Sequence, residues 1–371
     1  MSYKVTVITP AYNSEKTLPA ALQSLREQTL GFENIEYIVG FDTSTDGTAE
    51  LLHSWQNKFS NVSSVELPRE KGGPGAARNA ALALASAPYV MFLDADDEFT
   101  PRACETLCTV MDTRACDIAG GDFRTVECEG GHAVRATPSF LRFPEGEYDF
   151  THGLSVASEP FISAFWCKIF RRDIIEKNNL KMRDRSLFEE LMFLCRYLGF
   201  CSSGYYIKEN ITDYTVRPGS ASRTKNLYFY VSTAETILET AELVARDGKP
   251  ELVAQYLSCT DTVGEHVEWL LTDRELADDE LKTAFTTWRD LLTYCAKYGV
   301  HTESFAARLL MADARAGDET ALEADFFDLR RHFCERQAEL DGIFSSNTWK
   351  LAKLLEKSSS WRITELLKKF V

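Results

Sequence analysis

Long apolar runs are missing from this sequence. No stretch approaches the roughly 20 consecutive apolar residues that a membrane-spanning helix needs. The first residues lead directly into a short apolar stretch, without the longer apolar segment of a secretory signal peptide. We therefore expect a cytoplasmic protein that is soluble, or at most peripheral on the inner face of the cell membrane.

Positive charge is scarce. The 371 residues include 41 Lys and Arg against 56 Asp and Glu, so the formal net charge is -15. A surface of this sign repels polyanions, which argues against nucleic acid as a partner. A small anionic substrate remains compatible with this charge where basic side chains gather locally.

Metal-ligand spacings are absent as well. The ten cysteines include no Cys-x-x-Cys pair, and the six histidines show no ligand spacing. The pattern argues against a zinc site, and a disulfide framework is not expected in a chain of this length. We expect reduced cysteines that are mostly buried.

What the first hundred residues do contain is a regular alternation of strands and helices. Apolar runs predict strands at 4–9, 37–41, 64–67 and 89–93, with amphipathic or Ala-rich segments predicting helices between them. This order is typical of a parallel α/β sheet with helices on both faces. With 44% hydrophobic residues, the chain can build two domains, or one domain with a long extension.

Polar residues follow three of these strands directly. They are Pro10–Asn13, Asp42 and the acidic group that begins at Asp94. Ligands of open α/β sheets bind outside the carboxyl ends of the strands. The convergence of these residues predicts that residues 1–100 form one binding site.

The character of the chain changes further on. The pattern is mixed from Cys104 to Gly204, and beyond Tyr228 strand signals give way to helical spacing at 232–246, 251–271 and 276–298. We expect a domain over 1–225 and a helical domain over 226–345.

The final segment, 346–371, has a different charge from the rest. Residues 347–371 hold six Lys or Arg and two Glu, and apolar residues fall on one helical face. A basic amphipathic helix of this kind binds anionic membrane surfaces. The alternative is a helix that docks on the acidic body of the protein, and the sequence leaves both open.

Asp94 and Asp96 predict a metal site. Two carboxylates separated by one residue at a strand end can point into one cleft, and Mg²⁺ or Mn²⁺ prefers oxygen ligands that it shares with phosphates. An acidic turn that caps the next helix is the alternative interpretation.

The glycine-rich segment from Lys71 to Asn79 opens a predicted helix. A helix N-terminus favours phosphate, and Arg78 in the first turn can reach the same anion. Lys71 and Gly75 belong to the same predicted phosphate loop. Asp42 can accept a hydrogen bond from a base imide or a ribose hydroxyl, while Asp46-Gly47 is typical of a turn and helix cap.

Together these residues resemble family 2 glycosyltransferases of the GT-A fold. The matching segments are Pro10-Ala-Tyr-Asn13, Ser44-Thr-Asp-Gly-Thr48, Gly75-Ala-Ala-Arg-Asn79, Leu93-Asp-Ala-Asp-Asp97, Trp166-Cys-Lys-Ile-Phe-Arg-Arg172, Phe188-Glu-Glu-Leu-Met-Phe193 and Tyr214–Ser222. Each is weak singly, but their order over residues 3–223 is specific to the family.

The resemblance implies a Rossmann-like nucleotide-binding sheet and an inverting, metal-dependent transferase of hexosyl or N-acetylhexosaminyl groups. The donor is a nucleoside diphosphate sugar, with a UDP-sugar as the expectation, and the cofactor is Mg²⁺ or Mn²⁺. The acceptor is a hydroxyl of a cell-surface glycan or a lipid-linked molecule, which points to polysaccharide synthesis for the cell envelope.

The resemblance also implies a role for each matching residue. Asp42 contacts the base, Asp94 the ribose or the metal, and Asp96 the metal. The general base corresponds to Glu190. The rest of the donor site comprises Pro10, Ala11, Tyr12, Asn13, Lys71, Gly75, Arg78 and Ala95. The half from 101 to 225 holds the acceptor-site candidates Trp166, Lys168 and Glu189.

Two positions depart from the family pattern. Phe41 replaces an Asp that often precedes Asp42, and Glu190 replaces the usual Asp with a side chain one methylene longer. These departures keep open a second function, a catalytically weak sugar-nucleotide-binding or glycan-assembly protein. A nucleotidyltransferase is a third alternative, but Pro10–Asn13 is short and lacks the lysine of the loop expected in that class.

Overall fold

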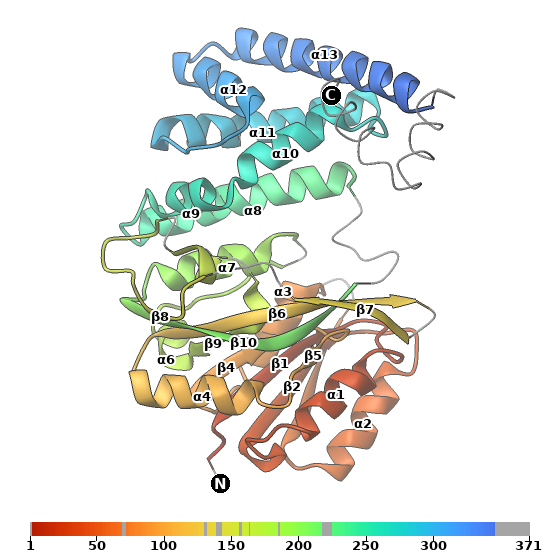
Figure 1. Cartoon of the computed structure of the whole chain (residues 1–371), viewed down its shortest axis with the longest axis vertical. Helices are drawn as coiled ribbons and strands as arrows, with labels where there is room; N and C mark the ends of the chain where they lie inside the picture. The colour runs from red at the N-terminus through yellow and green to blue at the C-terminus, as the bar shows by residue number, and fades with distance from the viewer. Residues whose placement is uncertain are drawn as a thin grey trace, which may run out of the picture. The chain divides into compact units, whose positions relative to one another are not determined.

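The computed structural model describes residues 2–68, 72–129, 132–138, 143–155, 158–162, 164–184, 186–216 and 225–345 (Figure 1). These residues form two compact units. The first contains the described residues up to Thr262 together with Tyr298–His301, and the second contains Val263–Lys297 and the described residues from Thr302. Lys71 and the basic tail 346–371 lie outside the described residues. The phosphate contact expected of Lys71 stays a prediction, and so do the two alternatives for the tail, a membrane contact or docking on the protein.

One sheet forms the centre of the first unit. Within the described residues its strands are β1 (Val5–Ala11), β2 (Ile35–Asp42), β3 (Val62–Leu67), β4 (Tyr89–Phe92), β5 (Glu98–Phe99), β6 (Ile118–Glu129), β7 (His132–Pro138), β8 (Gly146–Asp149), β9 (Lys168–Arg171) and β10 (Ser203–Val216). The spatial order is β3-β2-β1-β4-β9-β6-β10-β5, with β7 beside β6 and β8 beside β10. The four strands expected from the sequence lie together at one side of this order.

The first four strands are parallel, as predicted. β1 pairs in parallel with both β2 and β4, and β2 pairs in parallel with β3. The sheet as a whole is mixed, because β9 runs antiparallel to its neighbours β4 and β6. The parallel ends of β1, β2 and β4 therefore open on the same edge of the sheet.

Helices cover both faces of the sheet (Figure 1). On one face, α1 (Leu18–Arg26), α2 (Thr48–Lys58) and α4 (Ala103–Arg114) bury their apolar sides. Leu22 of α1 and Leu107 of α4 share a core with Met91 of β4. The next residue along β4, Phe92, points to the opposite face, because side chains alternate along a strand.

The second face is covered by α3 (Pro74–Leu82) and α7 (Glu189–Leu198). Phe92 meets Phe193 of α7 at a ring-centroid distance of 6.1 Å. The shorter helical segments of this unit are η1 (Phe32–Asn34), α5 (Glu159–Ile162), η4 (Phe165–Cys167) and α6 (Arg172–Lys177). This packing brings α7, from the second half of the unit, beside α3 from the first half.

The strands end at Val216, and helices follow, close to the change expected at 225. α8 (Leu227–Arg246) begins at the cap residue Asn226, whose side chain accepts a hydrogen bond from the Phe229 N–H. α8 and α9 (Leu252–Thr260) group with the sheet in the first compact unit. The boundary between the two compact units therefore lies further along the chain than the change from strands to helices.

Four further helices account for most of the second unit. They are α10 (Thr262–Thr272), α11 (Asp278–Tyr298), α12 (Phe305–Ala316) and α13 (Glu319–Ser345). The helical pattern expected over 251–271 is interrupted at Asp261, whose φ of 48° lies in the left-handed region that Asp tolerates. Phe285 of α11 stacks on Phe326 of α13 at 4.4 Å.

Two expectations from composition can be compared with the described residues. None of the helices in this part of the chain is long and apolar enough to cross a membrane. The described cysteines are free, and most are buried. Burial raises the pKa of the Cys108 thiol to about 12, so this thiol stays protonated at neutral pH.

Candidate active site

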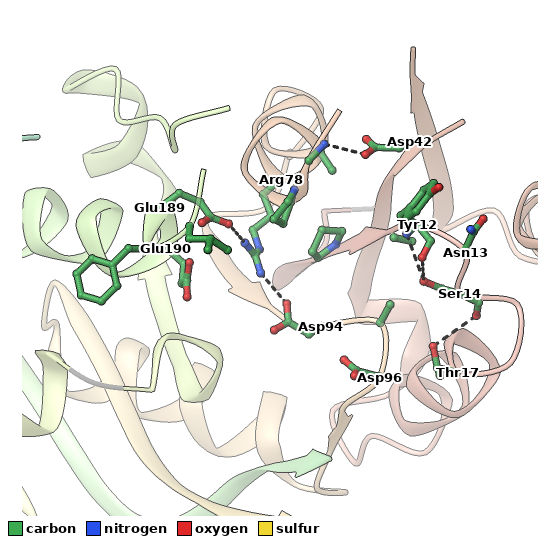
Figure 2. Close-up of a pocket in the computed structure, with 18 residues that line it drawn as sticks. Tyr12, Asn13, Ser14, Thr17, Asp42, Arg78, Asp94, Asp96, Glu189 and Glu190 are labelled. Carbon is green, nitrogen blue, oxygen red and sulfur yellow. Dashed lines mark hydrogen bonds and ion pairs between the residues drawn. The ribbon is translucent and has the colours of Figure 1, made fainter. Parts of the chain in front are cut away.

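A cavity of about 660 Å³ opens at the carboxyl ends of β1, β2 and β4 (Figure 2). Its described lining consists of Pro10, Ala11, Tyr12, Asn13, Ser14, Thr17, Asp42, Gly73, Pro74, Ala77, Arg78, Asp94, Ala95, Asp96, Leu187, Phe188, Glu189 and Glu190. The polar residues that follow three separate strands therefore do converge, as expected from the topology. The wall opposite them comes from the N-terminus of α7.

The loop after β1 is held by the loop after β2. Asn13 has a φ of 48°, and its side-chain oxygen accepts a hydrogen bond from the Thr45 N–H at 2.8 Å. One residue further, the Ser14 N–H donates to Thr48 Oγ1 at 2.8 Å. Asp46 accepts from the N–H of Thr48, the first residue of α2, within the turn that the sequence indicates at Asp46-Gly47. This network leaves Tyr12, which is 44% exposed, at the cavity wall.

Asp42 binds the glycine-rich loop from the other side. Its Oδ2 accepts a hydrogen bond from the Gly73 N–H at 2.7 Å. A Cβ at Gly72 would lie 2.2 Å from the same oxygen, so only glycine allows the backbone to approach this closely. The second oxygen, Oδ1, is buried and has no hydrogen-bond partner among the described residues. An unpaired acceptor in a cavity wall is suited to a ligand N–H.

The acidic residues that follow β4 have two different surroundings. Asp94 and Asp96 line the cavity. Asp97 is 1% exposed and accepts a hydrogen bond from the Thr215 N–H at 2.8 Å, so it anchors β10 to this loop. Among the described residues, no group of three or more His, Cys, Asp or Glu is placed to hold a metal ion. Two carboxylates alone would need ligands from a bound phosphate to complete a Mg²⁺ site.

Arg78 is buried between two carboxylates. One terminal nitrogen donates to Asp94 Oδ1 at 2.7 Å, and the other donates to Glu189 Oε1 at 3.2 Å (Figure 2). The side chain of Arg78 packs over the Phe165 ring at 5.7 Å. Both terminal nitrogens are therefore engaged with protein groups, whereas the sequence predicts that they bind phosphate.

The N-terminus of α7 presents two glutamates. Phe188, which precedes the helix, has a φ of 72°, a conformation that a bulky residue rarely adopts and that recurs at functional sites. Glu189 is 3% exposed, and Glu190 is half-buried. Burial, and next the Glu190 carboxylate, raise the pKa of Glu189, while Arg78 lowers it. The structure places Glu189 against Arg78, a structural contact of the kind that the sequence left open for it beside an acceptor role.

Two other residues of the α3 motif, Asn79 and Gly75, hold α3 to the segment before α7. Asn79 exchanges two hydrogen bonds with the backbone of Met182, donating at 2.8 Å and accepting at 2.9 Å. A Cβ at Gly75 would lie 2.2 Å from the Arg183 carbonyl oxygen. Gly75 lies outside the described lining of the cavity. The structure shows Gly75 in a close-packed contact, which the sequence did not indicate.

Replacing Gly75 by Ala is expected to destabilise the protein by about 1–3 kcal/mol, the usual cost of forcing atoms into a close-packed contact. The added methyl group would meet backbone, which cannot move aside without displacing α7. Urea unfolding measures the change. Gly199→Ala is the matched control, because its methyl group meets first the movable end of Leu252. Equal effects of the two substitutions would contradict the proposed contact.

Comparison with known proteins places this geometry in a family. The family model described as glycosyl transferase family 2 matches residues 6–178. The matched residues make up a little under half of the chain and are similar to this family. The match contains the three strand ends that form the cavity.

Sequence relatives of this chain are also named as glycosyltransferases. A poly(ribitol-phosphate) β-glucosyltransferase of Bacillus spizizenii is 33% identical over 34% of this chain and 20% of its own length. An uncharacterized glycosyltransferase of Escherichia coli, YibD, is 27% identical over 59% of this chain and 63% of its own length. The chain therefore covers less than two thirds of either relative.

A crystal structure of S. aureus TarS residues 1–349 in complex with UDP-GlcNAc is similar in fold. The TM-score is 0.70 at 21% sequence identity, and the similarity covers 91% of this chain and 92% of that one. The GT-A fold with a helical C-terminal region, expected from the sequence, is confirmed by this likeness.

Two acceptor-site candidates of the family motif lie outside the described lining of the cavity. Trp166 stacks on Tyr214 at 5.0 Å and packs against the core. Lys168 is 0% exposed, and its ammonium donates to the Ala164 carbonyl at 2.8 Å. Burial lowers the pKa of this ammonium. The expectation that Lys168 contacts an acceptor or a phosphate therefore does not match its position, because the side chain faces the interior.

Sequence reasoning missed several lining residues. Ser14, Thr17 and Leu187 belong to the cavity and were not selected from the sequence, and Pro74 and Ala77 were noted only as part of the glycine-rich segment. Their polarity and size are ordinary, so no signal singles them out without the fold. Phe41, the departure from the family pattern, is 3% exposed and belongs to the core beneath α1 and α2.

Proposed function

We propose that this protein transfers a hexosyl or N-acetylhexosaminyl group, with inversion, from a UDP-sugar to a hydroxyl of a cell-envelope glycan or a lipid-linked acceptor. One observation carries this proposal. Asp94 and Asp96 from the donor half line the same cavity as Glu190 from the other half. A glycosyl transferase has to stabilise the leaving group of the donor and to deprotonate the acceptor hydroxyl in the same cavity. Asp94 and Asp96 are suited to the first task, and Glu190 is suited to the second.

The donor-binding part of the proposal uses the loops after β1, β2 and β4. Tyr12 offers an exposed aromatic face for a base, and the unpaired oxygen of Asp42 can accept the imide N–H of uracil. Pro10, Ala11, Asn13 and Ala95 would complete the walls. The complex of TarS with UDP-GlcNAc supports a uridine nucleotide, although that likeness alone shows only the fold.

Mg²⁺ or Mn²⁺ fits the donor set at the strand end. The described cavity lining contains Asp42, Asp94, Asp96, Glu189 and Glu190 against the single guanidinium of Arg78. Such an excess of negative charge repels a diphosphate unless a cation accompanies it. Asp94 and Asp96 would hold the cation, which neutralises charge on the diphosphate as it departs.

Glu190 is proposed as the general base. Its carboxylate would take the proton from the acceptor hydroxyl while the hydroxyl oxygen bonds to the anomeric carbon. The bond from that carbon to the diphosphate oxygen breaks at the same time, so the nucleotide leaves as UDP. Attack from the side opposite the leaving group inverts the anomeric centre.

The acceptor is proposed from the relatives. Several are named for poly(ribitol-phosphate) or for minor teichoic acid synthesis, so their printed names point to cell-wall polymers. A polyol or glycan hydroxyl is the acceptor class we propose here. The test is transfer of a labelled sugar from a panel of UDP-sugars, with and without such acceptors. A protein that binds donor without hydrolysing or transferring it would instead be a binding or assembly protein.

Asp42→Asn tests the nucleotide part of the proposal. Asn keeps an oxygen for the Gly73 N–H but loses the negative charge and the second acceptor. UDP affinity is expected to fall roughly 10- to 100-fold, the scale of a lost charge-assisted hydrogen bond. Calorimetry with UDP and Mn²⁺ measures it, with Asp112→Asn on α4 as the control outside the cavity. Unchanged affinity in Asp42→Asn would remove Asp42 from the base site.

A further inference from the structure

Arg78 joins the two halves of the cavity. It stands on α3, 16 residues before Asp94 and 111 residues before Glu189, and its guanidinium is ion-paired with both. It is the basic side chain that the described lining of the cavity contains. Asp94 belongs to the proposed donor side, and Glu189 is adjacent in sequence to the proposed base.

The position of Arg78 is rigidly determined. The side chain is 5% exposed and packs over Phe165, and its Nε is buried without a hydrogen-bond partner among the described residues. A nitrogen buried in this way cannot reach a phosphate in the cavity without a change of rotamer. Each terminal nitrogen already donates to a carboxylate, Asp94 or Glu189, so the guanidinium is oriented by the protein itself.

The backbone beneath Arg78 is held to the segment that leads into α7. Asn79 is bonded twice to Met182, and Gly75 lies against the Arg183 carbonyl. α3 therefore fixes the distance between the guanidinium and the first turn of α7. A planar fork that meets two carboxylates at once holds their relative position more firmly than a lysine ammonium could.

Several charged groups surround Glu189. Arg78 faces it from α3, and Glu190 is its neighbour on α7. A smaller cavity on its other side is lined by Lys181, Arg183, Arg196 and Glu239. Arg183 and Arg196 are already paired, with Glu235 and Glu239 and with Asp247. The direct ion pair to Glu189 that the structure records is the one from Arg78.

We propose that Arg78 is a positioning residue that holds Asp94 and the Glu189–Glu190 pair in register, so that the base acts on an acceptor placed against the donor. This inference rests on the proposed transferase function. It gives Arg78 a task different from direct phosphate binding. Arg78 contributes to turnover through the two carboxylates and adds little to the affinity for UDP.

The test compares Arg78→Gln and Arg78→Lys with the wild type. Sugar transfer by the wild type is established first, so that its absence would count against the function and not against Arg78. In Arg78→Gln we expect kcat to fall at least 100-fold while the Kd for UDP with Mn²⁺ changes less than threefold. Arg78→Lys keeps the charge but not the fork, so we expect it to recover part of the lost kcat.

The pH profile separates positioning from simple destabilisation. Without the guanidinium, Glu189 keeps its proton to higher pH, because the opposing positive charge is gone. Arg78 also acts electrostatically on the proposed base Glu190, so its removal takes a positive charge away from that base, and the acidic limb of kcat should move to higher pH in Arg78→Gln. Arg196→Ala is the matched control, since it removes a mostly buried ion pair of α7 outside the main cavity, and its profile should not move.

Two results would overturn the proposal. A tenfold or larger loss of UDP affinity in Arg78→Gln with kcat retained would make Arg78 a phosphate ligand. A loss of kcat no larger than that of Arg196→Ala, with an unmoved pH limb, would make Arg78 a purely structural residue. If Arg78→Gln does not fold, Arg78→Lys replaces it, and its Kd for UDP and the acidic limb of its kcat profile distinguish positioning from phosphate binding.

Discussion

Replacing Glu190 by Gln is expected to lower turnover by roughly 10²–10⁴-fold, the usual contribution of a general base. The amide has the shape of the carboxylate but cannot take the proton of the acceptor hydroxyl. Glu190 is half-buried in the wall that faces Asp94 and Asp96, so the substitution leaves the donor side intact. Initial rates of sugar transfer, at saturating donor and acceptor, measure the effect.

Glu189→Gln is the matched variant for this experiment. Its carboxylate is ion-paired with Arg78, so its loss should disturb the register of the site without removing the base. We expect UDP binding to survive in both variants and turnover to fall further in Glu190→Gln. If turnover collapses in Glu189→Gln and survives in Glu190→Gln, the assignment is shifted by one residue. If neither matters, the base lies elsewhere.

Removing the metal, or one of its proposed ligands, should have an effect of similar size. We expect transfer to stop in EDTA and to return with Mn²⁺ or Mg²⁺, because the excess of carboxylates in the cavity leaves the diphosphate otherwise unneutralised. Asp96→Asn should lower turnover at least about 100-fold, since a Lewis acid supplies several kcal/mol of charge stabilisation. Transfer rates and calorimetric Mn²⁺ binding in the presence of UDP give two independent measurements.

Asp112→Asn serves as the control for Asp96→Asn. Asp112 is also an acidic residue with polar contacts, from Tyr89 and Lys4, but it lies outside the active-site cavity. It should keep wild-type turnover and Mn²⁺ affinity. Full activity in EDTA, or wild-type turnover in Asp96→Asn, would show that transfer proceeds without a metal at this position.

The donor half of the site was accessible from the sequence because its signals are local. Each predicted strand runs into polar residues, and parallel strands necessarily present those ends at one edge. Asp42, Asp94 and Asp96 are thus expected in one cavity from the sequence, and the structure places them there. The turn at Asp46, which accepts from the N–H of the first residue of α2, followed from the same short-range chemistry.

The sequence was less informative about residues whose surroundings come from distant segments of the chain. Lys168 carries the charge of a ligand contact, but the packing around β9 buries it completely. Gly75 and Arg78 fit a phosphate loop by their spacing. Their environment depends on the segment around Arg183 and Glu189, which no local pattern indicates.

By itself the sequence determined the order of strands and helices, the family and the residues at the strand ends, since periodicity and turn chemistry act over a few neighbouring residues. Only the tertiary structure decided that Arg78 pairs with Glu189 across 111 residues and that Asn79 holds Met182. It also decided that α8 and α9 group with the sheet. Such contacts depend on the packing of whole helices against each other, a sum of many small attractions that no single stretch of sequence contains.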